Sequence, residues 1–374
     1  MAVEQMIESP LLEAETVRRI LHADVDAFFA SVELRDHPQF ADAPFAVVTD
    51  PTTGVIASAN YPARAYGIHG AMRVAEARRL CSHLHIVPMR AQEYHRASAQ
   101  VFTLFRDYAT AIQPGSLEEA FLDVGDRDPL ATARELRRRA RSELGLPLSI
   151  GIGRTKLIAK LASRRAKPDG VLLVDAGAEQ SMRDALHLAD VWGVGPVTRE
   201  RLCAIGIHRV RDLDDRGVDE LATVVGLAMA RRLVSIALGT DDAAVTTPTP
   251  GRQISGERTV VPVSGDPAVV REFLRAAGSS ALARIDERGR DVSRVEVLLT
   301  DPDRGTDGSR VQLPAPTADH EQLLDAAELL LSGLLDGRRE PVLRARVTFT
   351  LAARQAPSRR ASALVSDDQL PLFA

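Results

Sequence analysis

Two acidic clusters are the residues of this chain best suited to carry out chemistry. Asp24-Val25-Asp26 follows one short apolar run, and Glu118-Glu119 precedes another. Runs of this kind predict buried strands, and a strand end can direct carboxylates into a cleft. Carboxylates gathered in this way bind divalent cations, and two such cations held close together are suited to in-line phosphoryl transfer. The acids alone leave a simpler interpretation open, in which each is a solvated turn residue at the end of a strand.

The elements that must position these acids alternate between helix and strand. The apolar periodicity predicts a strand running into a helix over 18–30, strands at 45–48 and 55–57, helices that open near Tyr61 and Arg73, helices at 94–110 and 130–144, and a strand at 148–152. Further on it predicts a helical segment over 178–243, strands at 295–299 and 343–351, and amphipathic helices at 267–288 and 317–335. The pattern predicts an α+β multidomain chain.

The composition sets the broad class of protein. With 374 residues, 45% of them hydrophobic, the chain is long enough for about two to four domains with sizeable cores. The first residues lack the basic start and apolar core of an export signal, and no apolar run long enough to span a membrane occurs, so a cytoplasmic protein is expected. Cys81 and Cys203 are the only cysteines, which suits a reducing compartment.

The charge distribution is more informative than the net charge of −4. Residues 131–170 hold eleven Lys or Arg against three Asp or Glu, a local net charge of +8, and include all three lysines of the chain, Lys156, Lys160 and Lys167. This segment is a candidate phosphate-facing surface. Residues 134–141 are better explained as a solvated helix face, because three consecutive arginines cannot all point to one ligand. For Lys160 and Lys167, the motifs in which they stand favour phosphate contacts over a solvated face.

Four segments, in order along the chain, carry a family resemblance: residues 27–33, 57–68, 116–120 and 166–170. Together with the acidic clusters they resemble the motifs of the Y-family, or translesion, DNA polymerases of the DNA polymerase IV class. The resemblance implies a right-hand fold with palm, small fingers, helical thumb and a C-terminal α+β little finger. It also implies template-directed, low-fidelity DNA synthesis on primer-template DNA from dNTPs, by two-metal nucleotidyl transfer.

The expected domain boundaries rest on the resemblance to the polymerase family and on the composition of the connecting segments. They are a disordered leader (1–17), a palm (18–177) with inserted fingers (about 28–93), a helical thumb with a helix-hairpin-helix (178–244), a linker (245–251), the little finger (252–355) and a disordered tail (356–374). The chain is expected to act as a monomer.

The family pattern assigns two Mg²⁺ ions, with Mn²⁺ as an alternative, to Asp24, Glu118, Glu119 and the backbone carbonyl of Val25. One ion would activate the primer 3′-hydroxyl, and the other would hold the triphosphate and neutralise the leaving pyrophosphate. The chain departs from the pattern at Glu118, where the family usually has Asp. A displacement of about 1 Å can cost on the order of 100-fold in rate, but Glu still binds Mg²⁺, so activity is expected to survive. Asp26 is expected to support the ligands rather than to bind metal.

Phe29 stands where this family places an aromatic steric gate. A ring packed under the deoxyribose leaves no room for a 2′-hydroxyl, so dNTPs are selected over NTPs by a clash. Phe28 would support the gate by packing. The alternative is that both rings are ordinary core residues.

Ser58, Tyr61, Arg64 and Lys167 match the nucleotide contacts of the family. Arg offers forked donors to phosphate oxygens, hydroxyls add neutral hydrogen bonds, and Lys supplies a compact positive charge. Ala65 is a second departure, because the family commonly has a basic residue there, and looser nucleotide binding is expected.

Gly193 and Gly195 resemble the hairpin of a helix-hairpin-helix, whose backbone N–H groups receive a DNA phosphate. A structural turn is the alternative, since Gly-x-Gly alone is a weak signal. Arg252 and Arg258 fall where the family's first little-finger strand follows the template backbone, with contacts that position DNA without reading its sequence.

Gln369, Leu370, Leu372 and Phe373 resemble the motif by which bacterial polymerases dock on the sliding clamp. Large apolar residues without a core to bury them require a partner, and tethering would raise the local concentration of the enzyme at the primer end. The alternative is an adhesive disordered segment.

The sequence leaves two alternatives to a working polymerase. The first is a catalytically weak or silent polymerase-like accessory that binds DNA and the clamp, which only the Glu118 departure favours. The second is a nucleotide cyclase with a similar palm, for which the steric gate, the glycine hairpin and the clamp motif would have no purpose.

Overall fold

The computed structural model describes residues 19–52, 54–214, 216–247, 252–286, 289–303 and 305–352. Two compact units make up the chain, divided between residues 248 and 249, inside the segment expected as a linker. The expected leader and tail lie outside the described residues. Among the helices of the described ranges, none is both long enough and apolar enough to cross a membrane.

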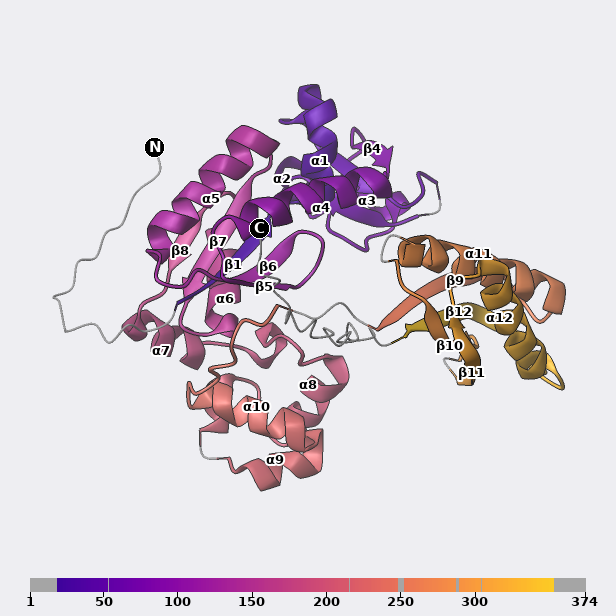
Figure 1. The fold of residues 1–374 in the computed structure, drawn as a ribbon. Coiled ribbons are helices and arrows are strands. Elements are labelled where there is room, and N and C mark those ends of the chain that lie inside the picture. The colour runs from indigo at the N-terminus through magenta and orange to yellow at the C-terminus, as the bar shows by residue number, and fades with distance from the viewer. Residues whose placement is uncertain are drawn as a thin grey trace, which may run out of the picture. The chain divides into compact units, whose positions relative to one another are not determined.

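A five-stranded sheet forms the centre of the first unit (Figure 1), in the order β5-β6-β1-β7-β8. Its strands are β1 (Ile20–Val25), β5 (Ala111–Pro114), β6 (Glu119–Asp123), β7 (Leu148–Gly153) and β8 (Val171–Leu173). The central strand β1 runs antiparallel to both β6 and β7. One acid of each cluster, Asp24 and Glu119, therefore belongs to neighbouring strands.

The two faces of this sheet have different neighbours, because side chains alternate along each strand. Leu21, Ala23 and Val25 of β1 enter the main core, which also contains residues of α4 (Ala91–Arg106) and α5 (Pro129–Leu144). His22 and Asp24 point to the opposite face, where α6 (Lys156–Ala166) packs. The catalytic candidates thus lie on the face that α6 partly covers.

Two glycines of β7 allow α6 to approach this closely. Ile150 and Ile152 point into the main core, whereas Gly151 and Gly153 face α6. A Cβ atom at Gly151 would collide with the backbone of Ala159 and Ser163. The alternation of Ile and Gly therefore fixes which side of the sheet carries α6.

A smaller three-stranded sheet, in the order β3-β2-β4, forms a separate part of the first unit with its own core. Its elements are β2 (Phe45–Val48), β3 (Ile56–Ala59), α2 (Tyr61–Arg64), α3 (Val74–Leu80) and β4 (His85–Pro88), and it is connected to β1 through α1 (Phe28–Asp36) and the short turn η1 (Pro38–Phe40). Asn60 caps α2 by accepting a hydrogen bond from the N–H of Ala63, and it also accepts one from the N–H of Phe45. This cap joins the helix that carries Tyr61 and Arg64 to the sheet.

A helical group completes the first unit and shares its core with α6. Its elements are α7 (Ala176–Asp184), η2 (Leu188–Asp190), α8 (Pro196–Cys203), η3 (Val210–Leu213), α9 (Val218–Val225) and α10 (Leu227–Ala237). The expected glycine hairpin connects η2 to α8. Gly193 has φ +91°, which a residue with a side chain rarely adopts, so this turn requires glycine.

The second unit is an antiparallel four-stranded sheet with two helices packed on one face (Figure 1). The sheet order is β11-β10-β12-β9, with β9 (Gln253–Ser264), β10 (Val292–Thr300), β11 (Thr306–Thr317), β12 (Val342–Leu351), α11 (Pro267–Asp286) and α12 (His320–Leu335). The expected helix at 317–335 begins three residues late because residues 306–317 form β11, a strand that was not predicted. Asp319 caps α12 by accepting a hydrogen bond from the N–H of Gln322.

Candidate active site

Asp24 and Glu119 are direct partners across the β1–β6 pairing. The N–H of Val25 donates to the carbonyl of Glu118 at 3.1 Å, which continues the pairing beyond the end of β6. Donor atoms of Asp24, Glu119 and His22 all lie within 4.8 Å of one another. The strand register thus brings together one acid from each of the two clusters.

Glu118 differs from this pair. It precedes β6, and its carboxylate is not part of the group formed by His22, Asp24 and Glu119. Burial raises the pKa of Glu118, and the nearby charges of Asp24 and Glu119 raise it further. The surroundings thus disfavour the charged form of the acid that stands at the unusual position of the family pattern.

Two lysines neutralise the paired carboxylates. Lys167 Nζ lies 2.8 Å from Asp24 Oδ1, and Lys160 Nζ lies 2.5 Å from Glu119 Oε2. Both lysines are expected to contact phosphates, and in this structure their ammonium groups lie on the candidate metal ligands.

His22 was not singled out from the sequence, although its spacing gave a signal. In a strand, residues two apart share a face, so a histidine two positions before Asp24 belongs to the same site. His22 is 1% exposed, its Nδ1 lies 2.7 Å from Ser163 Oγ, and its Nε2 lies 3.4 Å from Glu119 Oε2. The hydrogen bond from His22 and the nearby charge of Lys160 lower the pKa of Glu119 to about 2, while burial lowers the pKa of His22.

Asp26 is completely buried and acts as a structural acceptor. Ser149 donates to both of its carboxylate oxygens, at 3.0 and 2.8 Å, Tyr61 donates to Oδ1 at 3.2 Å, and the N–H of Asp169 donates to Oδ2 at 2.7 Å. Burial raises the pKa of Asp26, and these hydrogen bonds counteract that effect. Asp26 therefore connects β1, β7, the helix of Tyr61 and the loop that carries Lys167.

The two adjacent phenylalanines have different environments. Phe28 is 4% exposed and belongs to the main core. Phe29 is half-buried, and its ring stacks on Tyr94 with the centroids 4.3 Å apart. The Tyr94 hydroxyl in turn donates to the buried Glu33 at 2.7 Å.

The remaining nucleotide-contact candidates lie near the three-stranded sheet. Ser58 belongs to β3 and is nearly buried, and Tyr61 is half-buried. The exposed Arg64 donates from Nε to the carbonyl of Ala59 at 2.9 Å, and its guanidinium lies 5.1 Å from the Tyr61 ring centroid. Arg64 therefore leaves its terminal nitrogens available on the surface, beside the exposed Ala65.

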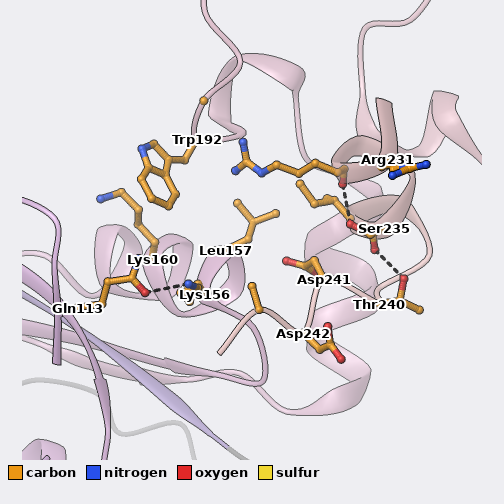
Figure 2. A pocket seen from close by; sticks show the side chains of 14 residues that line it. Gln113, Lys156, Leu157, Lys160, Trp192, Arg231, Ser235, Thr240, Asp241 and Asp242 are labelled. Atoms are coloured by element: carbon orange, nitrogen blue, oxygen red, sulfur yellow. Dashed lines mark hydrogen bonds between the residues drawn. The ribbon is translucent and has the colours of Figure 1, made fainter. Parts of the chain in front are cut away.

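A cavity of about 790 Å³ separates α6 from α10 and the glycine hairpin (Figure 2). Lys156, Lys160, Trp192 and Arg231 line it, together with Asp241 and Asp242 on the segment after α10. Trp192, the single tryptophan, directly precedes Gly193 and is 51% exposed. Gly193 of the hairpin thus lies beside a cavity lined by basic residues and an aromatic ring.

In the second unit, Arg252 and Arg258 are both exposed, and Arg258 is part of the edge strand β9. The tail residues 369–373 lie outside the described residues.

Comparisons with known proteins agree with this geometry. Residues 23–164 match the impB/mucB/samB family, and residues 252–361 match the C-terminal domain of the same family. A DNA polymerase IV of Desulfatibacillum aliphaticivorans is 34% identical over 333 residues, which cover 87% of this chain and 83% of that protein. The chain belongs to the DNA polymerase IV family.

Solved structures of Y-family polymerases share the fold. A Y-family DNA polymerase chimera matches with a TM-score of 0.78 at 25% identity, over 89% of this chain and 98% of the chimera. The insertion ternary complex of the Dbh DNA polymerase matches with a TM-score of 0.65 at 24% identity, over 89% of this chain and 98% of that one. The expected right-hand architecture is confirmed.

As a member of the DNA polymerase IV family, the chain is a DNA-directed DNA polymerase of the translesion class. Its relatives give no support to the accessory alternative. Polymerases of this family depend on metal ions, and the donors at the end of β1 fit such ions: Asp24 and Glu119 offer carboxylate oxygens, whereas both ring nitrogens of His22 already have partners.

Proposed function

We propose that this DNA polymerase IV family member performs translesion synthesis with two divalent cations, Mg²⁺ or Mn²⁺, held by Asp24, Glu118, Glu119 and the carbonyl of Val25. The observation that carries the proposal is the direct pairing of Asp24 with Glu119 across two neighbouring strands, within reach of a single cation. When bound, such cations supply the charge that activates the primer hydroxyl and neutralises the triphosphate.

The residues of the chain position the substrates around these carboxylates. Ser58, Tyr61, Arg64 and Lys167 bind the triphosphate oxygens, with Arg64 as the forked donor. Phe29 excludes the 2′-hydroxyl of a ribonucleotide, and Phe28 supports it from the core. Asp26 holds the helix of Tyr61 and the loop of Lys167 in register with β1, through the hydrogen bonds from Tyr61 and from the N–H of Asp169.

DNA is held by contacts that do not read its sequence. Gly193 and Gly195 present backbone N–H groups to one strand, and Arg252 and Arg258 contact the backbone from the second unit. In this assignment residues 18–177 form the palm and fingers, residues 178–244 the thumb, and residues 252–355 the little finger.

The tail residues Gln369, Leu370, Leu372 and Phe373 dock on the bacterial sliding clamp. The polymerase acts as a monomer, in the cytoplasm where the chromosomal template lies. Clamp tethering offsets the weak grip expected of a distributive enzyme.

Primer extension on an undamaged template, with dNTPs and either Mg²⁺ or Mn²⁺, tests the proposal. We expect the parent chain to extend the primer, Asp24→Ala to abolish extension, and Glu118→Asp to increase the rate. Asp126→Asn, which changes an exposed acid in a turn away from the site, is the matched control and should leave extension unchanged. Extension that survives Asp24→Ala would contradict the metal assignment.

A further inference from the structure

The two ammonium groups at the site lie on oxygens that the proposed cations would also bind. Lys167 approaches Asp24 Oδ1 at 2.8 Å, and Lys160 approaches Glu119 Oε2 at 2.5 Å. An ammonium group and a divalent cation compete for such an oxygen, because both are attracted to the same lone pairs. Each lysine therefore either stays in place beside the bound cation or moves away when the cation binds.

The surroundings of Lys160 make it a fixed neighbour. It lies within α6, is 13% exposed, and its Nζ is also 3.4 Å from Nε2 of the buried His22. Glu119 can keep this partner on one oxygen and still offer its other oxygen.

Lys167 has a different setting. It follows the last residue of α6 in extended conformation, with φ −67° and ψ 140°, and its side chain is 24% exposed. Two residues later, the N–H of Asp169 is held by the buried Asp26 at 2.7 Å. The backbone on both sides of Lys167 is thus anchored, while its flexible four-carbon side chain can swing without moving the loop.

We propose that Lys167 is a positioning residue that couples cation binding to triphosphate binding. It neutralises Asp24 before the cation binds, and it moves to the triphosphate when Asp24 takes the cation. The inference rests on the proposed function, which assigns Asp24 to the cation and Lys167 to the phosphates. By linkage, each ligand then strengthens the binding of the other, and Lys167 weakens cation binding while no nucleotide is present.

A purely structural role for Lys167 makes the opposite prediction for the free enzyme. If the ion pair only stabilised the loop, its removal would loosen Asp24 and weaken cation binding. If Lys167 occupies the oxygen in competition with the cation, its removal leaves an uncompensated carboxylate and strengthens cation binding.

Binding of Mn²⁺ to the full chain, without DNA or nucleotide, separates these roles. The free Mn²⁺ signal in electron paramagnetic resonance measures the affinity, with Asp24→Ala as the background. We expect Lys167→Met to bind Mn²⁺ at least about fivefold more tightly than the parent, the lower end of typical coupling between sites. Lys167→Arg, which keeps the charge, should bind as the parent does.

Lys156→Met is the matched control, because Lys156 begins the helix that precedes Lys167 and its ammonium donates to Gln113 and to the carbonyl of Ala244 rather than to a carboxylate. Its affinity for Mn²⁺ should be that of the parent. Equal affinities for the parent and Lys167→Met would overturn the coupling alone. Absence of Mn²⁺ binding above background in both would overturn the proposed function itself.

A second measurement follows Lys167 in the parent chain. Because the chain contains only three lysines, ¹³Cε labelling of lysine gives three signals, which Lys156→Met, Lys160→Met and Lys167→Met assign. We expect the Lys167 signal to shift with Mg²⁺ and again when dNTP is added, while the Lys156 signal stays in place. A Lys167 signal that does not respond to dNTP in the presence of Mg²⁺ would contradict the movement.

Discussion

The ring of Phe29 stacks on the ring of Tyr94, with the centroids 4.3 Å apart and the planes 23° from parallel. Tyr94 is 1% exposed, and its hydroxyl donates to Glu33, which Arg90 also contacts at 3.0 Å. Phe29, the proposed gate residue on α1, thus packs against a buried aromatic residue of α4. The position of the Phe29 ring therefore depends on its stacking against Tyr94.

This stacking predicts that removing either ring increases ribonucleotide incorporation, and that removing Phe29 has the larger effect. Phe29→Ala should increase incorporation of ribonucleotides relative to deoxyribonucleotides by about 10- to 200-fold, the range typical of one steric contact in a pocket. Tyr94→Ala should give a smaller increase, because the Phe29 ring can then drop from its position. Single-nucleotide insertion kinetics with matched dNTP and NTP measure both effects.

Two variants serve as controls for the gate. Tyr94→Phe keeps the ring and should keep the selectivity, although it loses the hydrogen bond to Glu33. Phe102→Leu changes another partly buried aromatic residue of α4 and should not alter the ratio. If Phe29→Ala incorporates NTPs no better than the parent does, Phe29 is not the steric gate.

Ala65 is the simplest position at which to strengthen nucleotide binding. It is exposed directly after α2, next to Arg64. A lysine there adds a positive charge near the triphosphate. The attraction between two unit charges at contact distance in water is worth about 1 kcal/mol, so Ala65→Lys should lower the KM for dNTP by about fivefold. Steady-state primer extension measures this change, and Ala65→Gln, which adds length without charge, should have the parent KM. A KM that stays the same in Ala65→Lys would place the triphosphate elsewhere.

The burial of Asp241 predicts that the folding stability falls as the pH rises through the range in which its carboxyl group titrates. Asp241 lines the cavity between α6 and α10 (Figure 2), and its burial raises its pKa from 3.8 to about 6, an effect that a hydrogen bond from Thr155 partly offsets. Below pH 3.8 the group is protonated in both the folded and unfolded states and contributes nothing. As the pH rises to about 6 the unfolded state loses its proton first, so folding stability falls, by up to about 3 kcal/mol.

Asp241→Asn should remove this pH-dependent loss. The free energy of unfolding of the variant, relative to the parent, should therefore increase between pH 4 and pH 7, as measured by urea denaturation at both values. Asp242→Asn changes the neighbouring exposed acid and should show no such trend. A difference between variant and parent that is the same at both pH values would indicate that the Asp241 carboxyl titrates normally.

The tail motif predicts a separable clamp interaction. Leu372→Ala combined with Phe373→Ala should weaken binding to a bacterial sliding clamp by at least about 30-fold, because anchor residues of a short peptide commonly carry about 2 kcal/mol or more. Surface plasmon resonance with immobilised clamp measures the affinity. Primer extension without clamp should be unaffected. The double variant Leu364→Ala and Val365→Ala tests whether apolar residues outside the motif have the same effect, in which case the motif has no special role.

Most helices and the longer strands of the first unit could be predicted from the sequence, because local periodicity and motif residues report directly on them, whereas the short strands β4, β5 and β8 were not predicted. The strands around the two acidic clusters, the helix after Phe28 and the helix that opens near Tyr61 all follow from patterns within a few residues of one another. The strand β11 was not predicted because most of its residues are exposed and its apolar residues are sparse. The start of the following helix was therefore expected three residues too early.

The sequence by itself determined the family and the identity of the acids, since both depend on residue types at fixed spacings along the chain. Only the tertiary structure decided which side chains meet. The register of β1 with β6 pairs Asp24 with Glu119 and leaves the Glu118 carboxylate outside their group. The close approach of α6 over Gly151 brings Lys160 to Glu119 and Ser163 to His22. Lys167 reaches Asp24 because Asp26 holds its loop, 143 residues away in sequence, against the sheet. Contacts of this range depend on how whole strands and helices pack, and no local pattern encodes them.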